Sequence, residues 1–121
     1  ISGLGIFDAP NNQIGEPGAG NVISGNHRAG IQMLGAGSDG NIVQSNLIGV
    51  ASGGMNALGN LWAGVMIVGA PNNTIGGSGT GLSNVISSNQ AEGISIFDPA
   101  STALPVTVVE SNPTVNPIVF P

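Results

Sequence analysis

The chain has no cysteine and no tyrosine, and its 121 residues include a single Lys or Arg residue, Arg28. Without cysteine it can form neither disulfides nor thiolate metal sites. One basic residue cannot supply the basic surface that nucleic-acid binding needs. No apolar run approaches the ~18 residues of a membrane-spanning helix. Disulfide scaffolds, nucleic-acid partners and helical membrane spans are therefore excluded.

Charge is also scarce, because charged residues make up 6% of the chain and the net charge is -5. Disordered chains combine high charge with low hydrophobicity, whereas 40% of this chain is hydrophobic. The 21 glycines therefore indicate tight turns in a folded chain rather than disorder. The length suits one domain with a modest core.

A repeated phrase organises the sequence: DAPNNQIGE at 8–16 returns as GAPNNTIGG at 69–77. It belongs to a longer unit, in which a glycine precedes two alternating apolar residues and two Asn-x-apolar segments follow. The unit opens at Gly3, Gly30, Gly64 and Gly93, which gives lengths of 27, 34 and 29 residues. Alternating apolar residues in short segments bounded by Gly, Asn and Pro predict strands, three in each unit.

Such short strands become stable when successive units stack at the roughly 4.8 Å spacing of paired strands and bury one continuous core. The sequence therefore predicts an all-β fold, a right-handed parallel β-helix of about three to four turns. Its repeats cover 1–98, and a tail without the repeat follows at 99–121 as a last rung, a cover or a donated strand. The predicted inward residues are Leu4, Ile6, Ile14, Ile23, Ile31, Met33, Val43, Ile48, Val65, Ile67, Ile75, Ile86, Ile94 and Ile96.

Asparagines recur at matching positions of each unit, so stacking places identical amides one above another. The two predicted ladders are Asn12, Asn41 and Asn73, and Asn21, Asn46 and Asn84. Amides stacked in this way hydrogen-bond along the axis, as they do in cross-β structures.

The segments NNTIGG, NVISSN and GISIF, with GNIVQSNLIGVASGGMNALGN, resemble the right-handed parallel β-helix repeats of very large bacterial secreted and surface proteins. The resemblance covers about residues 3–98 and implies an extracellular or cell-surface location. The wider superfamily, which is similar to the pectate lyases, includes enzymes that act on polysaccharides.

Little in the chain supports catalysis. Asp8 and Asp98 hold equivalent places in two units, but three turns separate them, or roughly 14 Å, beyond the ~5 to 9.5 Å of glycosidase carboxylate pairs. His27 and Arg28 could act as a base and an anion clamp, but an exposed polar corner is the favoured interpretation. Trp62 could stack on a sugar, but covering the edge of the core is the favoured role. We therefore predict that the chain is not an enzyme and that it has no catalytic residues, no ligand-binding residues and no cofactor.

Two outward columns of apolar residues are predicted from the strand parity. The first contains Phe7, Leu34, Val68 and Phe97, and the second contains Val22, Leu47 and Val85. Contiguous apolar patches of a few hundred Å² mark interfaces, so these seven residues are the candidate interface. If the end of one copy stacks on the start of another, Asp8 and Asp98 come close and could share a calcium ion.

The resulting hypothesis is a non-enzymatic extracellular structural module. It either stacks head to tail into a fibre or forms a segment of a larger, adhesin-like surface protein, so its first partner is itself. The alternative is a carbohydrate-active or carbohydrate-binding β-helix fragment with a polysaccharide partner.

Overall fold

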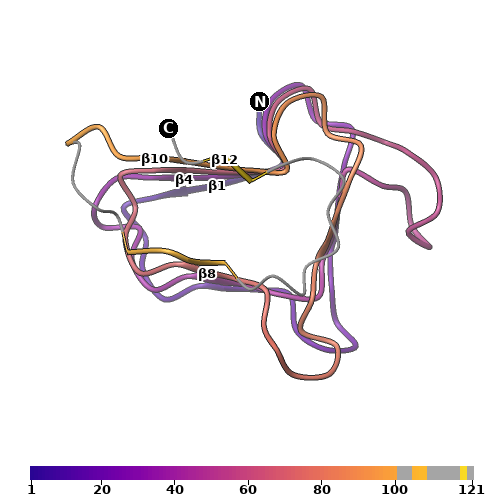
Figure 1. Cartoon of the computed structure of the whole chain (residues 1–121), viewed down its shortest axis with the longest axis horizontal. Helices are drawn as coiled ribbons and strands as arrows, with labels where there is room; N and C mark the ends of the chain where they lie inside the picture. The colour runs from indigo at the N-terminus through magenta and orange to yellow at the C-terminus, as the bar shows by residue number, and fades with distance from the viewer. Residues whose placement is uncertain (101–104, 109–117, 120–121) are drawn as a thin grey trace.

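In the computed structural model, which describes residues 1–100, 105–108 and the backbone of 118–119, the chain winds as a right-handed parallel β-solenoid (Figure 1). All of its strand pairs are parallel, and the described residues contain no helix. About three turns are complete, each with three strands, and a fourth opens at Gly93. The all-β class and the parallel coil predicted from the sequence are confirmed.

The strands form three sheets, one along each side of the coil. Sheet 1 has the order β1-β4-β7-β10-β12, sheet 2 the order β2-β5-β8-β11, and sheet 3 the order β3-β6-β9. The strands are β1 Leu4–Phe7, β2 Gln13–Ile14, β3 Val22–Ile23, β4 Ile31–Leu34, β5 Ile42–Val43, β6 Leu47–Ile48, β7 Val65–Val68, β8 Thr74–Ile75, β9 Val85–Ile86, β10 Ile94–Phe97, β11 Thr107–Val108 and β12 Ile118–Val119.

The register aligns equivalent residues of successive turns, as the repeat predicts. In sheet 1, Ile6 pairs with Met33, Met33 with Ile67, and Ile67 with Ile96. Because strand residues alternate between faces, a register that matches the repeat keeps every inward-facing apolar residue over another one in the next turn.

The core is the column of predicted inward residues. Twelve of the fourteen are buried, and the other two, Leu4 and Ile23, are partly buried and pack against the rest. Both of these lie in the first turn, which has another turn on only one side. Burial of each such side chain contributes about 1.5–3 kcal/mol before entropy is counted.

The glycine that opens each turn is required by close packing. A Cβ at Gly30 would lie 2.7 Å from the carbonyl oxygen of Gly64 and 2.9 Å from Nδ2 of Asn60. A Cβ at Gly64 would lie 2.7 Å from the oxygen of Gly93. Neighbouring turns thus approach too closely at this corner for any larger residue.

Two strands of the predicted tail extend the coil. β11 pairs with β8, which places Thr107 and Val108 beside Thr74 and Ile75 and continues sheet 2. β12 pairs with β10 through Ile94 and Ser95 and adds a fifth strand to sheet 1. Residues 101–104, 109–117 and 120–121 of the tail lie outside the described part, so the predicted division at residue 98 stays a prediction.

Candidate functional site

The feature of the molecule that most resembles a binding site is the open end of the first turn. A hollow of about 540 Å³ opens there. Its floor is apolar, formed by Leu4, Ile6, Ile14 and Ile23, and Asn12 and Asn21 lie at its rim. All of its lining residues belong to the first turn. It is therefore the exposed end of the core together with the first rung of the polar ladders.

The first ladder runs along the corner that precedes sheet 2. Nδ2 of Asn12 donates to Oδ1 of Asn41 over 2.8 Å, and the backbone N–H of Asn12 donates to the same oxygen over 2.8 Å. The N–H of Asn41 donates in turn to Oδ1 of Asn73 over 2.8 Å. Asn41 and Asn73 are fully buried, so this corner is a hydrogen-bonded column in the interior.

The second ladder precedes sheet 3 and is bonded more completely. Oδ1 of Asn46 accepts from the N–H and the Nδ2 of Asn21, and Nδ2 of Asn46 donates to Oδ1 of Asn84 and to the carbonyl oxygen of Ile14. By contrast, Nδ2 of Asn41 is the one buried side-chain atom of the described residues without a hydrogen-bond partner. Both predicted ladders are confirmed, and they differ in this respect.

A third ladder, which the sequence analysis missed, precedes sheet 1. It contains Asn26, Asn60 and Asn89: Oδ1 of Asn60 accepts from the N–H and Nδ2 of Asn26, and Oδ1 of Asn89 accepts from those of Asn60. Each of these asparagines stands four residues before the glycine of the next turn. That fixed spacing was the available signal.

The three ladders give the coil a chemical direction. In each, an asparagine donates to the amide oxygen of the following turn, so the first turn carries the terminal oxygens. No described residue donates to Oδ1 of Asn12, Asn21 or Asn26. The open end therefore combines an apolar hollow with three hydrogen-bond acceptors at its corners.

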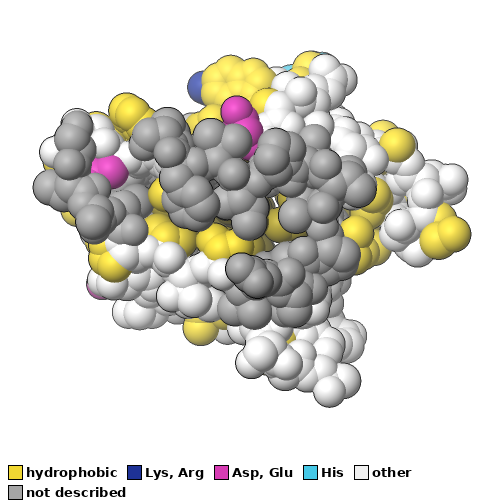
Figure 2. Space-filling model, in the orientation of Figure 1, with side chains coloured by type: hydrophobic (Ala, Val, Ile, Leu, Met, Phe, Trp, Pro, Cys, Tyr) yellow, Lys and Arg dark blue, Asp and Glu magenta, His cyan; other side chains and the backbone are white. Residues whose placement is uncertain are grey.

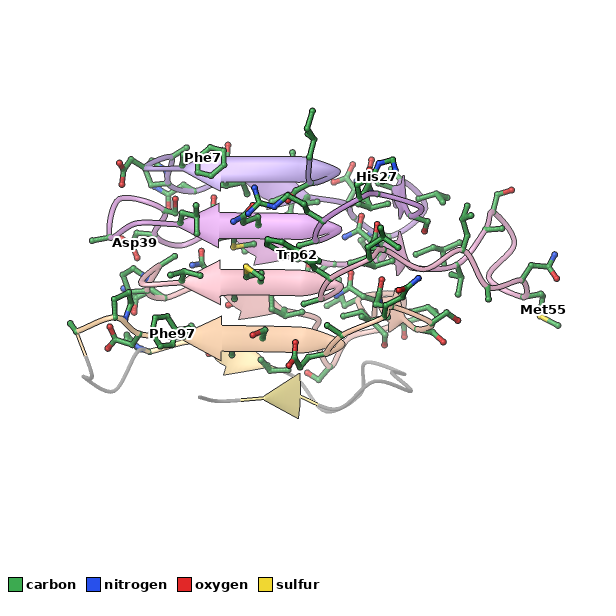
Figure 3. All side chains as sticks on the ribbon, turned by 90° about the horizontal axis from the view of Figure 1, so that it is seen from above. Phe7, His27, Asp39, Met55, Trp62 and Phe97 are labelled. Atoms are coloured by element: carbon green, nitrogen blue, oxygen red, sulfur yellow. The ribbon has the colours of Figure 1, made fainter. Side chains whose placement is uncertain are left out.

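The two predicted outward columns exist in the structure. Register aligns Phe7, Leu34, Val68 and Phe97 along sheet 1, and Figure 3 shows Phe7 and Phe97 on the same side of the first and fourth turns. The second column, Val22, Leu47 and Val85, runs along sheet 3. Phe7 is 60% exposed and Phe97 is 45% exposed, whereas the residues between them are half-buried. Their role as an interface stays a prediction.

Arg28 and Trp62 meet on an outer corner of the coil. The guanidinium carbon of Arg28 lies 4.1 Å from the centre of the Trp62 ring, which is a cation–π contact. In Figure 2 the basic group lies against hydrophobic atoms at the edge of the molecule. Both residues stand two positions after an asparagine of the third ladder, so stacking places them on neighbouring turns. The sequence analysis did not identify this ladder and therefore did not predict the contact. The ring remains 39% exposed.

The acidic residues do not converge on a site. Oδ1 of Asp8 accepts from the N–H of Gly37 over 3.4 Å, and Oδ1 of Asp98 accepts from the N–H of Ala100 over 2.9 Å. Asp39 accepts from Nδ2 of Asn72 over 2.8 Å. All three carboxylates lie at the corner between sheets 1 and 2, on different turns, and each accepts from a nearby backbone or amide N–H. Within the described part of the chain, no three His, Cys, Asp or Glu side chains gather closely enough to hold a metal ion.

The longest loop among the described residues projects from the second turn. An antiparallel bridge joins Val50 to Ala57, and the N–H of Ala51 donates to the oxygen of Asn56. Met55 lies at the outer part of this loop, far from the sheets, and is 88% exposed (Figure 3). The loop is therefore a small hairpin built on the side of the coil.

Comparisons with protein-family models, with curated proteins and with solved structures each find no match to this chain. The coil is thus defined by its own strand pairing, and membership of a particular family of bacterial repeats is a matter for proposal. None of the described residues belongs to a helix that is long and apolar enough to cross a membrane.

Proposed function

We propose that the chain is a non-enzymatic structural module that acts by stacking with further turns of parallel β-coil, in a fibre of copies or in a larger surface protein. The observation that carries the proposal is the open first turn. There the three ladders end in amide oxygens around an apolar hollow, at a strand edge that matches every other rung of the molecule. Open strand edges of this kind are templates for further pairing.

A turn that stacks there needs two chemical properties. It must bury Leu4 and Ile23, the partly exposed apolar residues of the hollow, and it must bring N–H donors to the three corner oxygens. A turn with the Asn-x-apolar pattern of this chain has both. Self-association is therefore favoured over a partner of unrelated chemistry.

The proposed location is outside the cell or at its surface, in line with the resemblance to bacterial repeat proteins of the pectate-lyase-like group. Low charge and a backbone held by many buried hydrogen bonds suit a passive structural role. The non-enzymatic assignment is supported by the wide spacing of Asp8 and Asp98, which directly follow β1 and β10, the first and fourth strands of sheet 1.

Sedimentation velocity of the purified chain across concentration tests the proposal. The expected result is reversible growth of the sedimentation coefficient with concentration. Leu4→Lys should suppress this growth because it places a charge in the hollow, whereas Gln32→Lys, on the outer face of the next strand, should leave it unchanged. Growth that is equal in both variants would show that association uses another surface.

A second candidate function, carbohydrate binding, is favoured by one observation: Trp62 is an exposed aromatic ring backed by a cation. Titration with acidic polysaccharides, followed by isothermal titration calorimetry, tests it. Saturable binding that is lost in Trp62→Ala and kept in His27→Ala would support this candidate, and cleavage of the polysaccharide would overturn the structural proposal. A titration that shows no binding would exclude carbohydrate binding as a function of this surface.

A further inference from the structure

We propose that the face of the Trp62 ring opposite Arg28 binds an arginine side chain of a partner protein. The site lies on the corner that carries the third ladder and shares no residue with the hollow of the first turn, so it is independent of stacking. Three features carry it: a backbone column that sets Arg28 against Trp62, a small residue at the next level of that column, and one carboxylate beside it.

Backbone hydrogen bonds place three residues of this corner in one column along the axis. The N–H of Trp62 donates to the carbonyl oxygen of Arg28 over 3.2 Å, and the N–H of Ala91 donates to the oxygen of Trp62 over 3.4 Å. The guanidinium carbon of Arg28 lies 4.1 Å from the centre of the Trp62 ring. One face of the ring is therefore directed at the first turn, and the other face is directed at the third.

The column leaves space beside this second face of the ring. Ala91 contributes only a methyl group at its level, whereas Arg28 contributes a guanidinium on the other side. Turns are spaced by roughly 4.8 Å, so a flat group at the level of Ala91 would lie within the ~6 Å of a cation–π contact. In Figure 2 the hydrophobic group beside the basic one presents a broad face to the viewer, in agreement with the 39% exposure of Trp62.

The charge beside the second face is negative. Glu92 follows Ala91 and is the one acidic residue within three positions of a third-ladder asparagine. Its carbonyl oxygen accepts from the N–H of Gly64 over 3.0 Å, which holds its backbone in the third turn next to the column. Figure 2 shows an acidic group at the edge of the hydrophobic one. An aromatic face with a carboxylate at its edge attracts a cation.

The contact of Arg28 shows which cation fits the ring. A second guanidinium can take the mirror position over the second face, and arginine is favoured over lysine because its planar, weakly hydrated group stacks on aromatic rings. The two guanidinium groups would be roughly 8 Å apart in contact with water, where their repulsion is weak and Glu92 opposes it. The net charge of -5 adds a general attraction for a basic partner.

Fluorescence titration of the full chain tests the site, because Trp62 is its one tryptophan. The probe is a peptide with three arginines separated by glycines, and a lysine peptide of the same length and charge is its control. The expected result is a saturable change in Trp62 emission, with binding of the arginine peptide about threefold tighter than binding of the lysine peptide.

Two pairs of variants separate the site from general attraction. Ala91→Leu fills the level beside the ring and should weaken binding of the arginine peptide about fivefold, whereas Ala36→Leu, exposed at the corner between sheets 1 and 2, should leave it unchanged. Glu92→Gln should weaken binding about threefold, and Glu16→Gln, which removes the same charge elsewhere, should weaken it less than about twofold. Circular dichroism checks that each variant is folded.

Equal affinities for the two peptides, with equal effects of the two substitutions in each pair, would show that the attraction is only general and would overturn the site. An emission that does not change with either peptide would overturn it as well. Saturable binding of an acidic polysaccharide but not of the arginine peptide would overturn it in favour of carbohydrate binding. The stacking proposal is tested separately by sedimentation and is unaffected by these results.

Discussion

Two asparagines of the second turn should respond very differently to the same substitution, although both are fully buried. Asn46→Asp and Asn41→Asp each replace an amide nitrogen by an oxygen with almost no change of shape. Nδ2 of Asn46 donates to the carbonyl oxygen of Ile14 over 2.8 Å and to Oδ1 of Asn84 over 3.1 Å. Nδ2 of Asn41 donates to nothing in the described part of the chain.

The magnitude follows from those bonds. Both variants bury a carboxylate, and in both the retained oxygen still accepts from the asparagine of the first turn. Only Asn46→Asp loses two hydrogen bonds and sets an oxygen against two acceptors. With about 1 kcal/mol for each bond and a further cost for the unpaired acceptors, Asn46→Asp should be about 2–4 kcal/mol less stable than Asn41→Asp.

The assay is urea denaturation, followed by far-ultraviolet circular dichroism and by the fluorescence of Trp62. The difference is a large part of the 5–15 kcal/mol that typically stabilises a domain. If Asn46→Asp does not fold, Asn46→Ala and Asn41→Ala carry the comparison with the same expected order. Equal free energies of unfolding, within about 0.5 kcal/mol, would refute the assignment of the ladder bonds.

Three further predictions concern other parts of the coil. Gly30→Ala should destabilise the fold by about 1–3 kcal/mol in thermal denaturation, because the added methyl group overpacks the corner against Gly64. Gly18→Ala is the control: its Cβ would have no atom within 4 Å, so it should cost about 1 kcal/mol or less, for its left-handed backbone. Equal losses of stability in the two variants would contradict the packing account. Ile67→Ala, fully buried in the third turn, should cost about 2–5 kcal/mol in urea denaturation, and Ile23→Ala, partly buried in the first turn, should cost clearly less. Arg28→Ala should change the emission of Trp62 and cost at most about 1 kcal/mol, while His27→Ala should leave the emission unchanged; an unaltered spectrum in Arg28→Ala would exclude the cation–π contact in solution.

The fold could be predicted from the sequence because one physical constraint repeats in every turn. A column such as Ile6, Met33 and Ile67 stays apolar since each member packs on the next, and two of the corner asparagine columns are regular for the same reason. The loops carry no such constraint. The hairpin around Met55 therefore leaves no periodic signal in the sequence.

The parts that were missed depend on alignment across unequal turns. Asn26, Asn60 and Asn89 are spaced by 34 and 29 residues and align only when counted back from the next glycine. The contact of Arg28 with Trp62 follows from that alignment, whereas their distance in the sequence suggests no contact. The hollow at the first turn is a property of the three-dimensional coil, so the sequence alone indicated stacking but not this hollow.

The most direct test of the stacking account is electron microscopy of the negatively stained chain across concentration, with Leu4→Lys alongside. The account predicts filaments for the unchanged chain, fewer or none for Leu4→Lys, and the rung spacing of about 4.8 Å in diffraction from aligned samples. Dispersed single particles at every concentration, in both proteins, would contradict it.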